Sequence, residues 1–159
     1  MVAATPRPSA YHRRVETLEI ETMPIAEFAF PGALRDRLVG LVISGAKTTT
    51  TGLLVEYELD GESVGRPGNL SVVIDSDGRR VAVIELLEAR VTRLADVDLS
   101  HALDEGEGDA DVASWRIGHE RFWRSYLPEL RERLGDPSFD IDDDTRVVLE
   151  RFRLVERLG

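Results

Sequence analysis

Apolar residues recur at helical spacing early in the chain, at Leu34, Leu38, Leu41 and Val42. Pro31 suits the first turn of a helix, and Gly45 suits the position just after the last turn. The segment KTTTTG that follows is rich in β-branched threonine, which is typical of an extended strand. The pattern therefore predicts a helix over residues 31–44 and a strand directly after it.

The middle of the chain has the pattern of a β-hairpin. Two β-rich runs, NLSVVID and RRVAVIELLEARVTRL, flank a turn over residues 75–78. Alternation along the second run places Val83 and Glu85 on one face, and Ala82 and Ile84 on the other. Just before the hairpin, the run LLVEYELDG predicts a short helix.

The second half of the chain is predicted to be mostly helical and to end in a strand. Residues 96–110 form an acidic segment with a short helix at its start, and residues 111–134 form a longer helix that Pro128 is expected to kink. The last run, TRVVLERFRLVERL, has the composition of a strand. This order of elements predicts an α+β fold with an antiparallel or mixed sheet. It forms one domain over residues 24–159, after an N-terminal extension over residues 1–23.

Composition narrows the class of protein. The 159 residues are 42% hydrophobic and 31% charged, which is typical of a globular domain. The absence of cysteine excludes disulfides, thiolate metal sites and a cysteine nucleophile. No apolar run approaches the roughly 18 residues of a membrane span, and the first residues lack the apolar core of a secretory signal. The sequence therefore predicts a cytoplasmic protein with no membrane partner.

The net charge limits the partners. A formal charge of −10 excludes a general binder of polyanions, because such proteins neutralise many phosphates with basic residues. A nucleotide, or a short RNA segment in a locally positive pocket, is compatible with this charge. Long RNA is expected to bind weakly and with a strong salt dependence.

Lysine is almost absent from the cationic residues. Of the 20 lysine and arginine residues, one is a lysine, Lys47. A desolvated amine can lose its proton, whereas a guanidinium cannot. A position that keeps lysine in such an arginine-rich chain is therefore a candidate for amine chemistry, with chance as the alternative.

The segment around Lys47 is polar and lies where a helix passes into an extended strand, so backbone donors and hydroxyls can converge there. Thr50 follows Lys47 by three residues, and a turn would let the amine and this hydroxyl meet. The alternative interpretation is a β-branched strand with a solvated lysine. Ser44, Gly45 and Thr48 are the neighbouring candidates for ligand binding.

Two further features each have a functional and a structural interpretation. Trp115, His119 and Phe122 share one face of the predicted helix and could stack a base, although a packed core is the favoured interpretation. Arg151 on the last strand suits a phosphate or a carboxylate of a ligand. An ion pair between Arg151 and the acidic segment is favoured, because the chain has a surplus of acids.

The loop over residues 105–109 places three carboxylates between glycines. One interpretation is a metal site, although the spacing of a calcium loop is absent. The favoured interpretation is that Asp109 or Asp111 caps the next helix. The sequence therefore predicts neither a metal nor a cofactor.

The motifs taken in order resemble the ASCH family, which has a PUA-like fold. The run S-G-x-K-T-x-T over residues 44–50 follows an amphipathic helix. The later matches are LLVEYELDGESV, PGNLSVVIDSDG, VAVIELLEARV, DEGEGD, SWRIGHERFW and ERFRLV, so the resemblance covers roughly residues 27–155. It implies a small β-barrel flanked by helices, a cleft beside the Gly-x-Lys segment, and binding of RNA or of a nucleotide.

The resemblance also implies catalytic roles. One branch of the family consists of amidohydrolases of acylated cytidine, and other relatives are reported ribonucleases. In the amidohydrolase branch the catalytic group is a lysine, a threonine three residues later, and a glutamate on a following strand. By position these roles fall on Lys47 as base, Thr50 as nucleophile and Glu85 as the carboxylate that orients them.

Three functions therefore stay open from the sequence. The first is a protein that binds RNA, a nucleotide or a modified nucleoside in a polar pocket around Lys47. The second is a hydrolase that acts on such a ligand, with Lys47, Thr50 and Glu85 lining one cleft. The third is an interaction module with a vestigial pocket. The oligomeric state is open, with a homodimer as one option.

Overall fold

One mixed sheet organises the chain. In the computed structural model, which describes residues 17–159, five strands lie in the order β1-β3-β4-β5-β2. The strands are β1 (Ile25–Ala26), β2 (Thr49–Leu53), β3 (Leu70–Ile74), β4 (Arg80–Arg93) and β5 (Arg146–Arg157). The β1–β3 pair is parallel and the other three pairs are antiparallel, which agrees with the predicted mixed sheet.

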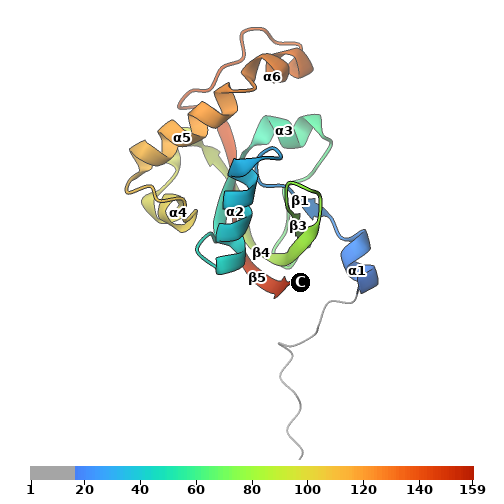
Figure 1. Cartoon of the computed structure of the whole chain (residues 1–159). Coiled ribbons are helices and arrows are strands. Elements are labelled where there is room, and N and C mark those ends of the chain that lie inside the picture. Colours follow the sequence, from blue (N-terminus) through green and yellow to red (C-terminus); the bar gives the residue numbers. More distant parts are fainter. Residues whose placement is uncertain (1–16) are drawn as a thin grey trace, which may run out of the picture.

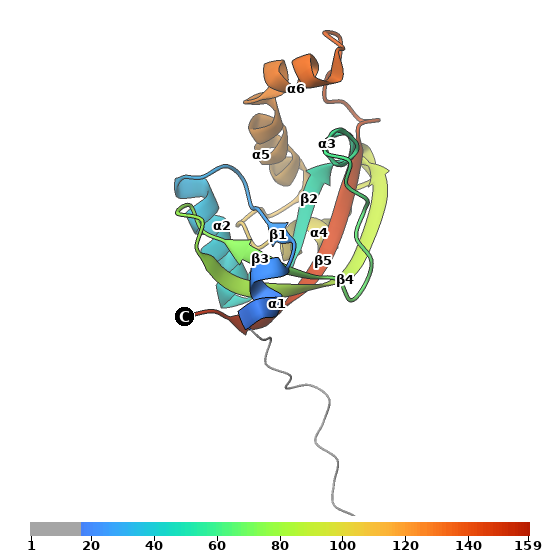
Figure 2. The ribbon, with the colours of Figure 1, turned by 90° about the vertical axis from the view of Figure 1, so that its right-hand side faces the viewer.

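The sheet is curved but does not close into the barrel that the family resemblance implied. β1 and β2 are its two edges, and no pairing joins them in the described part of the chain. β4 and β5 curve strongly across the molecule (Figure 2), with register shifts that leave extra residues on each strand. Such bulges increase the local bend and twist of a sheet. The β1 edge is only two residues long, and within residues 17–159 it pairs with β3 alone.

Between residues 17 and 159 the strands are accompanied by six α-helices and one short 3-10 turn. They are α1 (Thr17–Thr22), α2 (Ala33–Ser44), α3 (Leu54–Leu59), α4 (Leu99–Asp104), α5 (Val112–Arg124), α6 (Leu127–Leu134) and η1 (Leu94–Asp96). Figure 1 shows α4, α5 and α6 following one another along one side of the sheet, whereas α2 lies near β3 and β4. The predicted first helix, short second helix, hairpin and final strand are all confirmed.

The long helix predicted over residues 111–134 is instead two helices, α5 and α6. Pro128 has no amide hydrogen, and in a continuous helix its ring would clash with the carbonyl of Arg124. α5 ends at Arg124, and Pro128 lies in the first turn of α6, where a missing amide hydrogen costs nothing. At the other end of α5, the Asp111 carboxylate accepts a hydrogen bond from the Ser114 amide, which confirms the predicted cap.

Two apolar clusters fill the space on either side of the strands. One combines the indoles of Trp115 and Trp123 with Leu149 and other buried residues of α4, α6 and β5. The other packs α2 and Phe28 against β3, β4 and Phe152. Trp115 has no exposed surface, so the prediction that it belongs to the core is confirmed.

The loop between β1 and α2 is held in an uncommon conformation. Ala29 has a φ of 58°, the only positive φ at a non-glycine residue within residues 17–159. The buried guanidinium of Arg35 donates from Nη2 to the Ala29 carbonyl at 2.7 Å and to Glu27 Oε1 at 3.3 Å. A left-handed backbone at alanine persists only where surrounding contacts hold it.

Two further observations concern the predicted organisation. Residues 1–16 of the N-terminal extension lie outside the described residues, and α1 follows them. None of the helices between residues 17 and 159 has both the length and the apolar character needed to cross a membrane.

Replacing Ala29 with glycine is expected to stabilise the fold. The left-handed conformation costs alanine roughly 1–2 kcal/mol, whereas glycine adopts it without that penalty but with more entropy in the unfolded chain. The net gain in the free energy of unfolding should be about 0.5–1 kcal/mol, measured by urea denaturation. Ala113→Gly in α5 is the control and should cost about 1 kcal/mol. A loss of stability in both variants would contradict the strained conformation.

Candidate functional site

Lys47 lies between the end of α2 and the start of β2, and its side chain is buried. Gly45 ends α2 with a left-handed φ of 84°, which turns the chain so that the Lys47 amide donates to the Leu41 carbonyl at 3.1 Å. The side chain is only 2% exposed, and its Nζ lies 3.1 Å from Glu107 Oε2. Nζ also lies 3.5 Å from the Glu105 carbonyl. Lys47 is therefore a buried and paired cation.

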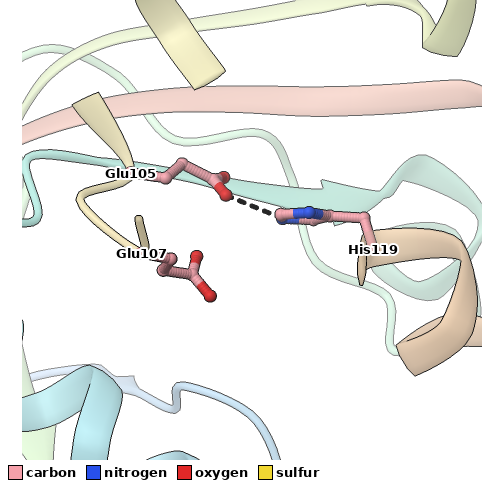
Figure 3. A group of neighbouring side chains, drawn as sticks. All are labelled: Glu105, Glu107 and His119. Atoms are coloured by element: carbon pink, nitrogen blue, oxygen red, sulfur yellow. Dashed lines mark ion pairs between the residues drawn. The ribbon is translucent and has the colours of Figure 1, made fainter. Parts of the chain in front are cut away.

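The carboxylate of Glu105 is fully buried and accepts hydrogen bonds from two separate elements. Thr51 on β2 donates to Oε1 at 2.8 Å. Trp115 and His119 on α5 both approach Oε2, with Trp115 Nε1 at 2.8 Å and His119 Nε2 at 2.7 Å. Figure 3 shows Glu105 and His119 pointing toward one another, with Glu107 beside them. Glu105 thus joins the edge strand to the helical side of the domain.

The two histidines of the described chain are oriented by their other contacts. His119 Nδ1 lies 2.9 Å from the Trp115 carbonyl, and the His119 ring stacks on the Trp115 indole with centroids 4.1 Å apart. His101 Nε2 lies 2.8 Å from Thr51 Oγ1 and 3.6 Å from Glu105 Oε1. We call the group of Lys47, Thr51, His101, Glu105, Glu107, Trp115 and His119 the Lys47 cluster.

The environment moves the pKa values of the two glutamates in opposite directions. Burial raises the pKa of Glu105, but hydrogen bonds from His101 and His119 and the charge of Lys47 outweigh burial and hold this pKa well below 4.5. Burial also raises the pKa of Glu107, and there the opposing charge of Lys47 does not overcome it. Glu105 therefore holds its negative charge to lower pH than an ordinary glutamate, whereas Glu107 takes up a proton more readily than one.

His119 responds to the same charges. Burial lowers its pKa, but the hydrogen bond and the charge of Glu105 outweigh burial and raise the pKa above 6.5. The side chains of His119 and Glu107 keep 16% and 18% exposure, whereas Glu105 has none. A ligand would therefore reach the cluster at His119 and Glu107.

Gly106 allows the acidic loop to lie against the lysine segment. Its φ is 69°, and a Cβ built at this position would lie 2.2 Å from the Ala46 carbonyl oxygen. Only a residue without a Cβ fits such an approach. The glycine thereby places Glu105 and Glu107 on either side of the Lys47 amine.

Glu105, Glu107 and His119 each offer one ligand atom, and these atoms lie within 4.8 Å of one another. Both oxygens of Glu105 already accept hydrogen bonds from the protein. Lys47 also places a positive charge 3.1 Å from Glu107, where a metal ion would have to bind. The arrangement favours an ion-pair cluster centred on lysine over a metal centre.

The structure does not bring Thr50 or Glu85 to the Lys47 amine. Alternation along β2 places Thr50 on the face opposite Thr49 and Thr51, which both bond to α4 or the loop after it. Glu85 pairs with Arg153 at 2.6 Å. Its neighbour Ile84 packs in the apolar cluster of α2, so Glu85 points to the opposite face of β4. The hydroxyl that reaches the cluster belongs to Thr51.

The other predicted ligand-binding residues make structural contacts. The Ser44 hydroxyl donates to the Leu41 carbonyl at 3.0 Å, and the Thr48 amide donates to the Asp104 carbonyl at 2.9 Å. Gly45 ends α2. Arg151 forms an ion pair with Asp104 at 2.9 Å, as favoured from the surplus of acids.

A polar cavity of about 330 Å³ lies next to the cluster, on the far side of His101. It is lined by Glu88, Arg90, Asp98, Ser100, His101, Leu149, Glu150 and Arg151. Lys47 does not line this cavity. The cavity mixes arginines with a larger number of acids, so it has no clear preference for an anion.

Sequence reasoning missed four members of the Lys47 cluster, namely Thr51, His101, Glu105 and Glu107. A signal was present in the acidic loop, where glycine separates two glutamates just before a helix that contains tryptophan and histidine. Capping of α5 explained Asp111 but left the two glutamates unexplained.

Comparison with known proteins identifies the family. The family model of the ASCH domain matches residues 18–156. The chain belongs to the ASCH domain family. No curated protein matches this ASCH domain.

Solved structures share its fold. An ASCH domain from Lactobacillus crispatus JV V101 is 26% identical, with a TM-score of 0.69; the alignment covers 89% of this chain and 86% of that one. A protein from Enterococcus faecalis V583, described with family DUF984, is 23% identical with a TM-score of 0.71, and the alignment covers 84% of this chain and 77% of that one. At 23% identity, this second likeness supports the fold alone.

Replacing Gly106 with alanine should destabilise this ASCH domain more than the same change at Gly108. Both glycines have positive φ, but only Gly106 lies against the backbone of another segment. Gly108→Ala should cost about 1–2 kcal/mol through its backbone conformation. Gly106→Ala should cost roughly 2–5 kcal/mol, because steric overlap is added. Equal losses in urea denaturation would contradict the close approach.

Replacing Glu105 with glutamine should lower the free energy of unfolding at pH 7 by about 3–5 kcal/mol, because the buried donors of Thr51, Trp115 and His119 lose an anionic acceptor and face an amide donor instead. The pKa of Glu105 is lower in the folded than in the unfolded chain, so its stabilisation is present above about pH 4.5 and is lost as the pH falls through the folded value. The difference between wild type and Glu105→Gln should therefore shrink below about pH 4.5.

The matched control is Glu88→Gln, whose side chain is 58% exposed. It should change the free energy of unfolding by no more than about 0.5 kcal/mol. A Glu105→Gln difference that stays constant from pH 7 to pH 3 would show that the carboxylate charge is not the stabilising feature.

Proposed function

We propose that this ASCH domain binds a nucleotide or a modified nucleoside at the accessible edge of the Lys47 cluster. The observation that carries the proposal is that two buried charged groups, Lys47 and Glu105, each have a partly exposed partner, Glu107 for Lys47 and His119 for Glu105. The Glu107 carboxylate can accept a hydrogen bond from an amine or hydroxyl of the ligand, and Lys47 behind it balances negative charge.

Charge favours a small ligand over long RNA. The net charge of −10 repels an extended phosphate chain. Near the cluster the balance is different, because Arg37 on α2 donates to the Glu107 carbonyl at 2.7 Å and adds an exposed cation at the rim. A single nucleotide would use this local charge without meeting the rest of the acidic surface.

Burial of Lys47 disfavours the interpretation of the domain as an interaction module with a vestigial pocket. A solvated lysine would need no partner, but this amine is 2% exposed and lies beside a carboxylate. Buried charges are retained at a cost, which a chain without a functional site could avoid with apolar residues.

A second function, hydrolysis of the bound ligand, is favoured by the opposite pKa shifts of Glu105 and Glu107. Neighbouring carboxyls with separated pKa values are the pattern of acid–base catalysis. The raised pKa of Glu107 and its exposed edge suit a group that accepts and returns a proton. Glu105, held as an anion, orients His119 and Thr51.

For an N-acylated nucleoside, the step begins with attack of a water oxygen on the acyl carbon while Glu107 takes the water proton. The carbon–nitrogen bond then breaks, Glu107 returns the proton to the leaving nitrogen, and the products are a carboxylic acid and the free amine. Lys47 lies behind Glu107 and does not contact the substrate, but its positive charge favours the negative charge that develops on the acyl oxygen. The family resemblance implied Lys47 as the base and Thr50 as the nucleophile. In this scheme Glu107 is the base and water is the nucleophile.

Glu107→Gln tests the catalytic role directly. With N4-acetylcytidine as substrate, the variant should lose turnover by about 10²–10⁴-fold, because an amide cannot carry the proton. Binding of N4-acetylcytidine, measured by calorimetry, should change by less than about tenfold, since the amide oxygen still accepts a hydrogen bond. Product release is followed by chromatography.

Two variants serve as comparisons. Glu88→Gln should leave turnover unchanged, and Thr50→Val should retain it, because no hydrogen bond of the described residues joins Thr50 to the cluster. Loss of turnover in Thr50→Val would restore the threonine nucleophile. Saturable binding of N4-acetylcytidine by the wild type without turnover would support binding and exclude hydrolysis of this substrate. Absence of binding at millimolar ligand would overturn both proposed functions.

A further inference from the structure

We propose that Phe30 is a binding residue that stacks on the planar ring of the ligand at the Lys47 cluster. The ligand class is thereby narrowed to molecules that carry a nucleobase next to an anionic or polar group. This inference rests on the proposed binding function and adds to it the residue that recognises the base.

The side chain of Phe30 is conspicuous because it is 57% exposed although it is a large aromatic. Its ring nevertheless contacts two others, with centroids 5.6 Å from Phe122 and 5.2 Å from Tyr126. One part of the ring is thus supported by the protein and the rest is open to solvent. A supported ring with an open face is the arrangement that stacks bases in single-stranded nucleic-acid sites.

Phe30 is linked to the Lys47 cluster by α5, the helix that supports its ring, and by its own loop. Phe122 follows His119 by three residues on α5, so the two side chains lie on adjacent turns of one helix face. Phe28, two residues before Phe30, has its ring centroid 6.0 Å from Lys47 Nζ. The segments that hold the Phe30 ring therefore also carry His119 of the cluster and Phe28, which contacts Lys47.

The backbone beneath Phe30 is held in place rather than left free. Ala29 has a left-handed φ of 58°, and the buried Arg35 donates to its carbonyl at 2.7 Å. On the other side of Phe30, Ser76 Oγ accepts from the Gly32 amide at 2.8 Å and donates to the Gly32 carbonyl at 3.0 Å. Strained backbone that neighbouring contacts maintain is concentrated at ligand-binding segments.

Arg35 adds a second unusual feature to the loop. Its Nε is a buried donor with no hydrogen-bond partner among the described residues. A buried donor without a partner costs about 1–3 kcal/mol, so the chain tolerates a penalty to hold this loop. We assign Arg35 a positioning role, because it fixes the backbone that presents Phe30 and does not itself reach the surface.

Charge complementarity favours a nucleotide as the occupant over an apolar protein segment. The helix that supports the ring supplies His119, with its raised pKa, to a cluster that also contains Lys47 and has exposed Arg37 at its rim. A purely apolar partner would leave these groups desolvated and unpaired. A planar base joined to a phosphate satisfies both the ring and the cations.

The test compares two probes that differ only in the base. Cytidine 5′-monophosphate and ribose 5-phosphate are titrated by calorimetry into wild type, Phe30→Leu and Phe30→Trp. Phe30→Leu should weaken binding of the cytidine nucleotide by roughly tenfold or more, the range measured for base–aromatic stacking. Phe30→Trp should bind the cytidine nucleotide about as tightly as wild type, because tryptophan can also stack on the base. Binding of ribose 5-phosphate should be the same in all three proteins.

Ile117→Ala is the matched control, because Ile117 is 58% exposed on α5 and points away from Trp115 and His119. It should leave both titrations unchanged, and thermal melts should show that each variant is folded. Equal binding of the cytidine nucleotide to wild type and Phe30→Leu would overturn the stacking role but leave the proposed function intact. Failure of the wild type to bind the nucleotide at all would overturn both.

Discussion

The buried carboxylate of Glu105 is the interaction on which the arrangement of this ASCH domain depends. A charge with no exposed surface is tolerated only when donors surround it, and a missing donor would cost several kcal/mol. The chain supplies those donors from distant elements, Thr51 from β2 and both Trp115 and His119 from α5. The helical side of the domain is thereby fixed against the edge of the sheet by a polar contact, and the apolar core around Trp115 packs behind it.

The Glu105 carboxylate and its neighbour Glu107 have different acid–base properties. Burial raises the pKa of Glu107, and the negative charge of Glu105 adds to this, so that the opposing charge of Lys47 does not restore the ordinary value. Gly106, between the two glutamates, lets the loop pass close to the backbone of Ala46. The glutamates therefore differ in position as well as in pKa. A structural anion and a proton-accepting group thus arise from residues two positions apart, and the second of them has an exposed edge.

Local patterns in the sequence predicted most of the elements, because helix periodicity, turn residues and β-branched runs act over a few residues.

The site was predictable only in part. Lys47 was found through arginine bias, but its partners depend on which face of β2 the threonines point to and on where the acidic loop folds back. Thr50 and Thr51 differ only by one step of alternation, and Glu85 is separated from the amine by the thickness of the sheet. Such distinctions depend on long-range pairing that no local pattern carries. The division of the predicted long helix follows the local rule that an interior proline kinks or breaks a helix, and at Pro128 the helix breaks rather than kinks.

The geometry also changes the meaning of the single lysine. Arginine bias made Lys47 a candidate base, but the space around its amine offers a structural reason for lysine as well. Two oxygens lie within hydrogen-bonding reach of Nζ, those of Glu107 and of the Glu105 carbonyl. A guanidinium would bring five donors into the same buried space and leave most of them without an acceptor. The ammonium fits because it is compact and needs few partners, whether or not it ever loses a proton. Retention of lysine therefore does not by itself indicate amine catalysis, and the argument for chemistry at this site rests on Glu107.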